Sequence, residues 1–254
     1  MSQYASSITG NVLLNIRGID KYLYNIGGNH VIPGKNSLAI LDDTITKYSD
    51  YSLKTLQNKT IWFRFKDIDT PSNVKKWTLA FWYYTKNSLF SRSEWMYSGL
   101  SANSSVYTNE PAYFFLPNMS RSIGLYIQLT EHRNSTNDTN IMDGGTYRLM
   151  QEQSINTWNY YAVTRNDNYF YIFRNGTLLT SKAVVNEPWY SINSISTSNM
   201  GSEDYFDDIF YMEDQCLWTS SFTVPDNYLL GDSSTLIKTK MWPYDHYDDK
   251  IYLY

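Results

Sequence analysis

The sequence predicts an all-β protein, built as a β-sandwich or jelly roll. Aromatic and β-branched residues alternate with other residues in several short runs, and turn residues recur about every ten positions. One Asn-Gly pair separates two such runs. The helical signal is weak and confined to Tyr48–Asn58, which lacks caps at both ends. A length of 254 residues is compatible with one large all-β domain.

The clearest predicted strand is Trp77–Tyr84, which is rich in aromatic residues. A period of two divides its side chains between two faces, and one face consists of Trp77, Leu79, Phe81 and Tyr83. The other face consists of Thr78, Ala80, Trp82 and Tyr84. The same alternation predicts strands over Thr60–Phe65 and Gly124–Thr130.

A hairpin is predicted over Asn168–Ser181. Asn175-Gly176 lies between two strand-like runs and supplies the two positive-φ residues of a type I′ turn. Trp158–Arg165 forms a further predicted strand just before the hairpin, and a short loop joins the three strands into a meander.

Composition excludes several classes of protein. The chain is 42% hydrophobic and 17% aromatic with a net charge of −4, which excludes a disordered chain. Lys and Arg total 21 against 25 acidic residues, so no nucleic acid is expected as a partner. No stretch approaches the roughly 18 apolar residues of a membrane span, so no membrane insertion is expected. Residues 1–16 lack a signal-peptide pattern, which predicts synthesis in a cytoplasm without secretion by that route.

Four segments carry a family resemblance, in this order along the chain: Gly10–Gly18, Trp77–Tyr84, Asn156–Gly176 and Tyr205–Tyr228. Together they resemble the concanavalin A-like jelly roll in its laminin G-like form. The last segment, YFDDIFYMEDQCLWTSSFTVPDNY, is similar to the final strand and tail of the bacteriophage virion versions. Arg17 and Tyr211 depart from the family pattern. The position of Arg17 often holds an acidic residue or a histidine in the family, and the position of Tyr211 often holds a basic residue.

The resemblance implies a single jelly-roll domain over residues 1–228. Residues 229–254 would form a C-terminal extension, either a final strand or a docking arm. It further implies a non-catalytic structural protein of a bacteriophage virion, on the capsid or the tail. The expected partners are other virion proteins, host cell-surface polysaccharide, or further copies of the chain in a homo-oligomer.

The aromatic excess indicates carbohydrate binding, since sugar rings pack their C–H faces on Trp and Tyr. If Trp77 and its neighbours face the core, Trp82 and Tyr84 lie on the opposite surface of the sheet, and Tyr169 and Tyr171 are expected to join them. The alternative is that loops or neighbouring subunits cover both faces, because interfaces also enrich Tyr and Trp. In a purely architectural subunit, neighbouring chains would bury these aromatics.

Asp207 and Asp208 are the candidate metal ligands, and Ca²⁺ is the candidate cofactor. They lie in an acidic stretch without Lys or Arg, and Ca²⁺ takes carboxylate and carbonyl oxygens. The alternative is a solvated loop followed by one Asp paired with a neighbouring Arg. Adjacent residues of a regular strand point to opposite faces, which favours this alternative.

A polysaccharide-degrading hydrolase or lyase is the alternative function, and it requires two carboxylates across a cleft. The acidic run Glu203–Asp208 lacks the Glu-x-Asp-x-x-Glu spacing of hydrolases with this fold, and Glu94 stands alone. The three histidines, His30, His132 and His246, have loop-like polar contexts. Cys216 is expected to be a small buried residue. The sequence therefore predicts a binding or structural protein and not an enzyme.

Overall fold

The computed structural model describes only part of the chain. The described residues are 7–19, 22–25, 32–33, 39–48, 50–55, 60–64, 74–86, 93–97, 118–120, 124–127, 130–133, 137–140, 147–148, 156–183, 194–199, 204–230 and 239–243. They contain strands, turns and bends but no α-helix, and every strand pair among them is antiparallel. No helix in this part of the chain could cross a membrane.

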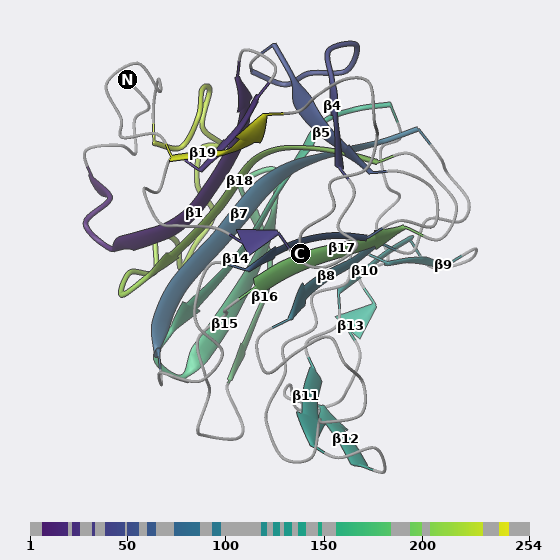
Figure 1. Ribbon diagram of the computed structural model, residues 1–254. Helices are drawn as coiled ribbons and strands as arrows, with labels where there is room; N and C mark the ends of the chain where they lie inside the picture. Colours follow the sequence, from purple (N-terminus) through teal and green to yellow (C-terminus); the bar gives the residue numbers. More distant parts are fainter. Residues whose placement is uncertain are drawn as a thin grey trace.

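One large sheet dominates the structure (Figure 1). Its strands follow the order β16 (Thr177–Ala183), β15 (Tyr169–Arg174), β14 (Asn159–Asn166), β7 (Lys76–Thr85), β18 (Asp204–Glu213), β1 (Asn11–Ile19), β2 (Tyr22–Asn25) and β19 (Thr239–Pro243). The short strand β5 (Ser52–Thr55) pairs with both β18 and β4 (Ala39–Asp42).

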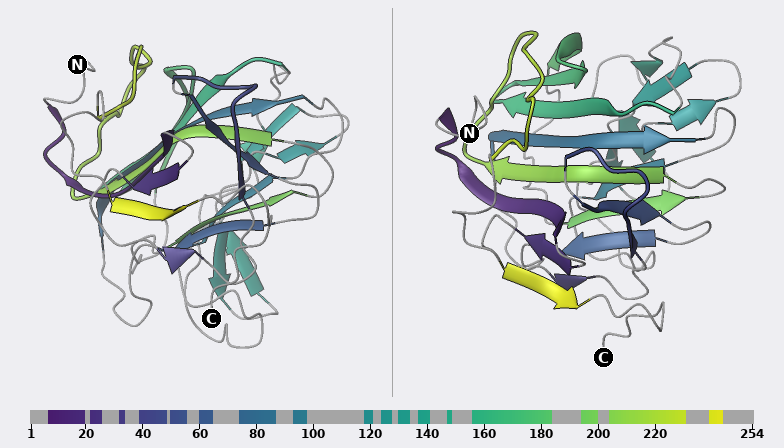
Figure 2. Two further views of the ribbon diagram at one scale, coloured as in Figure 1. Left: turned by 45° about the horizontal axis from the view of Figure 1, so that its top comes forward. Right: turned by 90° about the horizontal axis from the view of Figure 1, so that it is seen from above.

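A four-stranded sheet forms a second layer on one side of the large sheet (Figures 1 and 2). Its order is β3 (Ile32–Pro33), β6 (Thr60–Arg64), β17 (Ser194–Asn199) and β8 (Ser93–Tyr97). Two smaller sheets comprise β9 (Asn118–Ser120), β10 (Gly124–Ile127) and β13 (Tyr147–Arg148), and β11 (Thr130–Arg133) and β12 (Asn137–Asn140). The predicted β-sandwich is therefore confirmed.

The four segments of the family resemblance all contribute to the large sheet, as β1, β7, the β14–β15 pair and β18. The predicted hairpin is also confirmed, because Asn175 has φ 48° and Gly176 has φ 76°, as a type I′ turn requires. The weak helical signal within Tyr48–Asn58 is wrong for Ser52–Thr55. Ser52–Thr55 forms β5, because its backbone pairs with both β4 and β18.

The two faces of β7 are both buried. On the face toward the second layer, which we call the inner face, Phe81 stacks on Tyr161 at a centroid distance of 5.8 Å and contacts Phe206 at 6.3 Å. The opposite, outer face is covered by two segments, which lie in front of the sheet in the right-hand view of Figure 2. They are the outer-face loop, residues 43–48, and the strap, residues 214–230, drawn in dark blue and yellow-green.

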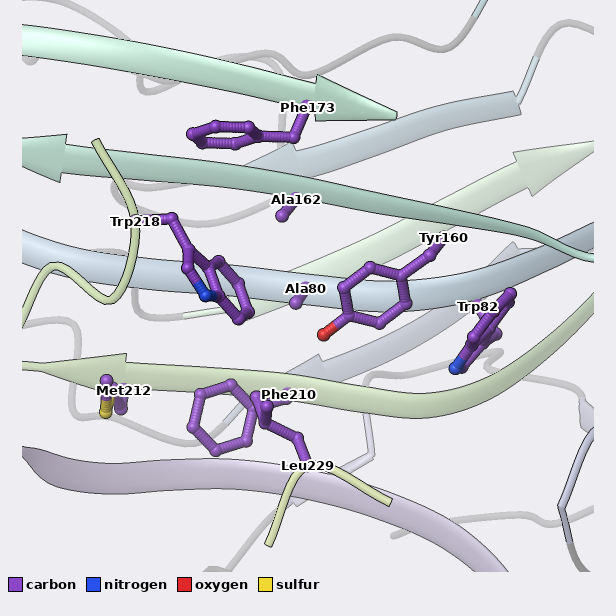
Figure 3. Packing of buried hydrophobic residues seen from close by; sticks show 9 residues of the cluster. All are labelled: Ala80, Trp82, Tyr160, Ala162, Phe173, Phe210, Met212, Trp218 and Leu229. Carbon is purple, nitrogen blue, oxygen red and sulfur yellow. The ribbon is translucent and has the colours of Figure 1, made fainter. Parts of the chain in front are cut away.

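The strap packs where the sheet offers its smallest side chains. Ala80 and Ala162 are paired across β7 and β14, and they lie between the rings of Trp218 and Tyr160 (Figure 3). Trp218 stacks on Phe222 within the strap, with centroids 3.9 Å apart and ring planes 8° apart. Two alanines leave room for these rings to approach the sheet, so an apolar core forms on the outer face.

Polar contacts fix the position of the strap. The hydroxyl of Thr164 donates to the carbonyl oxygen of Trp218 at 2.6 Å. The amide of Phe222 donates to the carbonyl oxygen of Gly176 in the hairpin turn at 2.8 Å. A Cβ at Gly176 would lie 2.1 Å from the carbonyl oxygen of Phe222, so only glycine permits this approach. The strap is thus held to the sheet at several points along its length.

Candidate functional site

Asp207 and Asp208, the candidate calcium ligands, lie in a β-bulge of β18. Asp207 pairs with Trp82 and Phe210 pairs with Ala80, so β18 has one more residue than β7 over this stretch. Within the bulge, Asp208 has a φ of 47°, which lies in the left-handed region that Asp and Asn tolerate better than most residues. Both carboxylates consequently contact the segments that cover the outer face. The expectation that they point to opposite faces is wrong, because it assumed a regular strand.

Asp208 forms a buried ion pair with Arg17. The guanidinium Nε lies 3.3 Å from Oδ1 of Asp208, and the two side chains are 0% and 1% exposed. The amide of Asn15 donates to the same oxygen at 2.7 Å, and the backbone amide of Leu229 donates to Oδ2 at 2.8 Å. The Arg17 guanidinium also lies 3.8 Å from the ring centroid of Tyr228. The structure thus supports the Asp–Arg alternative to calcium, with the pair buried and not in a solvated loop.

Asp207 holds the outer-face loop. Its carboxylate accepts the backbone amide of Asp208 at 2.8 Å and that of Tyr48 at 3.2 Å. Burial, together with the nearby charge of Asp208, raises the pKa of Asp207 to about 7, although the backbone hydrogen bonds oppose this shift. Within the part of the chain that the structure describes, no three His, Cys, Asp or Glu side chains form a metal-binding group.

Trp82 does not lie on an open surface. It is only 6% exposed, because Tyr48 packs on it edge-to-face at 5.6 Å and the ammonium of Lys47 lies 3.9 Å from its ring centroid. Tyr48 in turn contacts Tyr228 at 5.2 Å and donates its hydroxyl to the carbonyl oxygen of Pro225. The expectation of an exposed Trp82 is corrected, since the loop and the strap of the same chain cover it.

Tyr84 is half-buried at the same end of the outer face. Its ring packs against Trp158 at 5.5 Å and against Tyr205 at 5.7 Å. The indole of Trp158 donates to the carbonyl oxygen of Thr46, which fixes the ring beside the outer-face loop. Tyr84 therefore lies at the border of the covered area, where part of its ring reaches solvent.

Tyr169 and Tyr171 form the exposed pair of the outer face. Their ring centroids are 6.3 Å apart with planes tilted by 38°, and Tyr169 is 49% exposed while Tyr171 is half-buried. The alternating neighbours Phe170 and Ile172 are buried, which resolves the register of the strand. On β14, Tyr171 pairs with Thr164 and Trp82 pairs with Tyr160. These two positions of β14 are four residues apart, so Tyr171 and Trp82 are separated by about 13 Å along the strand. The four predicted aromatics therefore do not form one site.

Polar groups surround the tyrosine pair. Asn166 is paired with Tyr169 on one side and with Lys76 on the other. Lys76 and Asp167 are both about half exposed, and their charged atoms lie 3.8 Å apart. Cys216, in the strap, is close enough to Tyr171 to contribute to a raised pKa of its hydroxyl, for which burial is the main cause. An aromatic surface with hydrogen-bonding groups at its rim is typical of a carbohydrate site.

Several candidates lie outside the described residues or lack a described side chain. His30, His246 and Glu203 lie outside the described residues. His132 and Glu94 lie in described strands, but their side chains are not described. Sequence reasoning missed the roles of Lys47 and Tyr48, because nothing in the local pattern of residues 43–48 indicates that they cover a distant strand.

No protein-family model and no curated protein matches the sequence. The structure is similar to the binding domain of Paraclostridial Mosquitocidal Protein 1, with 12% identity, a TM-score of 0.56, and coverage of 85% of this chain and 51% of that one. It is also similar to the binding domain of botulinum neurotoxin serotype D, with 14% identity, a TM-score of 0.56, and coverage of 84% of this chain and 50% of that one. A third similar structure is the binding domain of botulinum neurotoxin DC in complex with SialylT, with 11% identity, a TM-score of 0.52, and coverage of 82% of this chain and 48% of that one.

The fold is a concanavalin A-like jelly roll. The predicted fold class is thereby confirmed, and the similar chains are binding domains by name. At these identities the likeness concerns the fold alone. This chain spans about half the length of the solved chains that it matches.

We expect Asp208→Asn to lower the free energy of unfolding by about 3 to 5 kcal/mol, since a buried guanidinium loses its counter-charge. Asparagine tolerates a positive φ as aspartate does, so the variant tests the charge and not the backbone. Urea-induced unfolding measures the change, with the exposed Asp43→Asn in the outer-face loop as the control, expected within about 0.5 kcal/mol of wild type. Equal stability of Asp208→Asn and wild type would contradict the assignment.

Stability should also depend on the protonation of Asp207. Its pKa is about 7 in the folded protein against 3.8 for an ordinary aspartate, so between these values the folded state binds more protons than the unfolded state. The free energy of unfolding should therefore rise as the pH falls from 8 to 5, by at most about 3 kcal/mol. Urea unfolding of wild type and Asp207→Asn across this range isolates the contribution, because all other groups titrate in both. Parallel pH profiles would refute it.

Proposed function

We propose that the chain is a non-catalytic carbohydrate-binding module, with Tyr169 and Tyr171 as its binding surface. The observation that carries the proposal is the exposure of Tyr169. Among the residues whose side-chain exposure the structure describes, Tyr169 is the one large hydrophobic residue that is exposed, at 49%, although the chain is 17% aromatic. Its ring lies 6.3 Å from that of Tyr171, so the two tyrosines form a small aromatic surface on which a ligand can stack.

The place of the pair in the fold supports this reading. The strap covers the adjoining residues, since Thr78 donates its hydroxyl to the carbonyl oxygen of Gln215 and Thr164 donates to that of Trp218. Tyr171 packs against the core that the strap encloses, and Tyr169 lies one step beyond it. The ring of Tyr171 is therefore fixed by packing, while the ring of Tyr169 is open to solvent. A sugar can pack its C–H face on such rings and hydrogen-bond to the polar rim.

Three of the four carboxylates of β18 support binding over hydrolysis. Asp208 is neutralised by Arg17, Asp207 accepts backbone amides, and Glu213 accepts the hydroxyl of Tyr211 at 3.1 Å. All three side chains are buried within the sheet. Carboxylates used in this way maintain the fold, whereas a glycosidase holds an acid and a base across an open cleft.

The similar structures offer limited support. The binding domain of botulinum neurotoxin DC has been solved with SialylT, which is a property of that protein. The likeness shows that a jelly roll of this kind occurs in binding domains. Because this chain covers only about half of that one, the location of the ligand there is not transferred here.

A glycan array that includes bacterial surface polysaccharides tests the proposal. We expect Tyr169→Ala to weaken binding at least tenfold, because it removes the exposed ring, and Tyr169→Phe to stay within about threefold, because it keeps the ring. Trp82→Ala is unsuitable as a probe, since truncating a buried tryptophan costs about 3 to 5 kcal/mol of stability. No bound glycan, or equal binding by Tyr169→Ala and wild type, would overturn the proposal.

For the setting, we propose the surface of a bacteriophage particle, on the capsid or the tail, with other virion proteins as neighbours. The resemblance of the Trp218–Pro225 stretch of the strap to virion proteins of this fold supports it. Mass spectrometry of purified particles is expected to find the chain at stoichiometric levels. Its absence from particles, with presence in the lysate of infected cells, would refute the setting and leave the binding proposal standing.

A further inference from the structure

Tyr169 lies in a row of side chains that crosses four strands of the outer face. Asn166 of β14 is paired with Tyr169 of β15 on one side and with Lys76 of β7 on the other. Tyr169 is in turn paired with Ala183 of β16. We call these four residues the open row. Neighbouring strands are about 4.8 Å apart, so the open row is about 14 Å long.

Every member of the open row reaches solvent. Its two ends, Lys76 and Ala183, are exposed, as is Tyr169 between them. Asn166 is half-buried. An aromatic ring and polar side chains are therefore accessible together along one line across the sheet.

The first part of the strap borders the open row. Its hydrogen bonds attach it to Thr78 of β7 and to Thr164 of β14, which are paired with each other across the two strands. Both threonines are fully buried, and they form the next row of the outer face, two residues farther from the end of the sheet. Residues 215–218 of the strap therefore cross β7 and β14 in the same direction as the open row (Figure 2).

The strap also determines the direction in which a long ligand can lie. Along β15 the next outer-face residue after Tyr171 is Phe173, which is fully buried against Trp218 and Phe222 at centroid distances of 6.5 Å and 5.2 Å. A ligand that follows β15 from Tyr169 is consequently blocked by the strap after Tyr171. Across the strands, the surface is open over the whole length of the row.

The polar members of the row suit the hydroxyl groups of a sugar. The amide of Asn166 offers both donors and an acceptor. The ammonium of Lys76 lies 3.8 Å from the carboxylate of Asp167, and both side chains are about half exposed. Exposed ion pairs contribute little stability, so these groups can donate to and accept from sugar hydroxyls at little cost.

We propose that the open row binds a saccharide chain along its length, with the chain lying across β16, β15, β14 and β7 beside the strap. One sugar unit packs on Tyr169 and Tyr171. Units on one side of it contact Asn166 and Lys76, and a unit on the other side lies over Ala183, whose small side chain leaves room. The ligand class is therefore an extended oligosaccharide or polysaccharide and not a single terminal sugar. This inference rests on the proposed function, because it requires that Tyr169 binds a sugar.

The dependence of affinity on chain length tests the inference. The probes are size-separated oligosaccharides, from the single unit upwards, prepared from the polysaccharide that binds most strongly on the array. We expect isothermal titration to show the affinity rising about tenfold or more from the single unit to the chain that spans the row, and then staying constant, because no further contacts are added. Equal affinity at every length, with binding still lost in Tyr169→Ala, would overturn the inference and leave the proposed function standing. If no polysaccharide binds on the array, both fall.

Lys76→Ala tests one end of the row. Lys76 lies two strands, about 10 Å, from Tyr169, so the variant should weaken binding of the longer oligosaccharides about threefold or more and leave that of the single unit unchanged. Damage to the fold would instead weaken binding at every length. Lys75→Ala is the matched control, because Lys75 is exposed and alternation places it on the opposite face. Equal weakening by both lysine variants, or by Lys76→Ala at every length, would refute the contact.

Ala183→Gln tests the other end by adding bulk where the row crosses β16. The larger side chain should weaken binding of the longer oligosaccharides about threefold or more. Thr177→Gln, at an exposed position at the opposite end of β16, is the control and should leave the affinity unchanged. Unchanged affinity in Ala183→Gln would contradict a chain that extends onto β16.

Discussion

The contacts of Asp208 are the interaction on which the outer face depends. One carboxylate connects three segments, accepting from Asn15 and Arg17 of β1 and from the backbone amide of Leu229 in the strap, while it belongs to β18 itself. A buried carboxylate is tolerated only when its charge is paired and its oxygens accept hydrogen bonds. The positive φ of Asp208 makes this arrangement possible, because the extra residue of the bulge turns its side chain toward the strap. Asp207, beside it, then remains available to hold the outer-face loop through Tyr48.

The contacts of Asp207 and Asp208 determine which surfaces of the sheet are open to solvent, because they hold the outer-face loop and the strap in place. A sheet with aromatic residues on both faces would expose a large apolar area unless something covered the second face. Here the strap and the loop cover its centre, where Trp82 and Tyr160 are almost fully buried. Tyr169 on β15, and Tyr84 and Trp158 near the outer-face loop, reach solvent where the cover ends. The location of the tyrosine pair at the surface is therefore a consequence of how far the strap extends.

The sequence predicted the features that depend on local pattern. Alternation identified β7, and the Asn175-Gly176 pair identified the hairpin, because both signals arise from neighbouring residues. The burial of Trp82 was beyond such reasoning, since its cover comes from Tyr48 and from a strap that lies more than a hundred residues away along the chain. The bulge was equally hidden, because one residue with positive φ reverses the expected facing of Asp208 without changing the composition of the strand. The partners Arg17 and Asp208 are 191 residues apart, so only the folded sheet brings them together.

The two ends of the outer face present different charged groups beside their aromatic rings. Near Tyr169, the cation of Lys76 is balanced by Asp167 at 3.8 Å, so the surroundings of the ring are close to neutral. Near Tyr84, the ammonium groups of Lys54 and Lys86 lie over the ring of Tyr205, and the carboxylate of Asp42 lies 3.7 Å from the ammonium group of Lys54. Stacking on an aromatic ring is available to any sugar with an apolar face, so the tyrosine pair does not require a charged ligand.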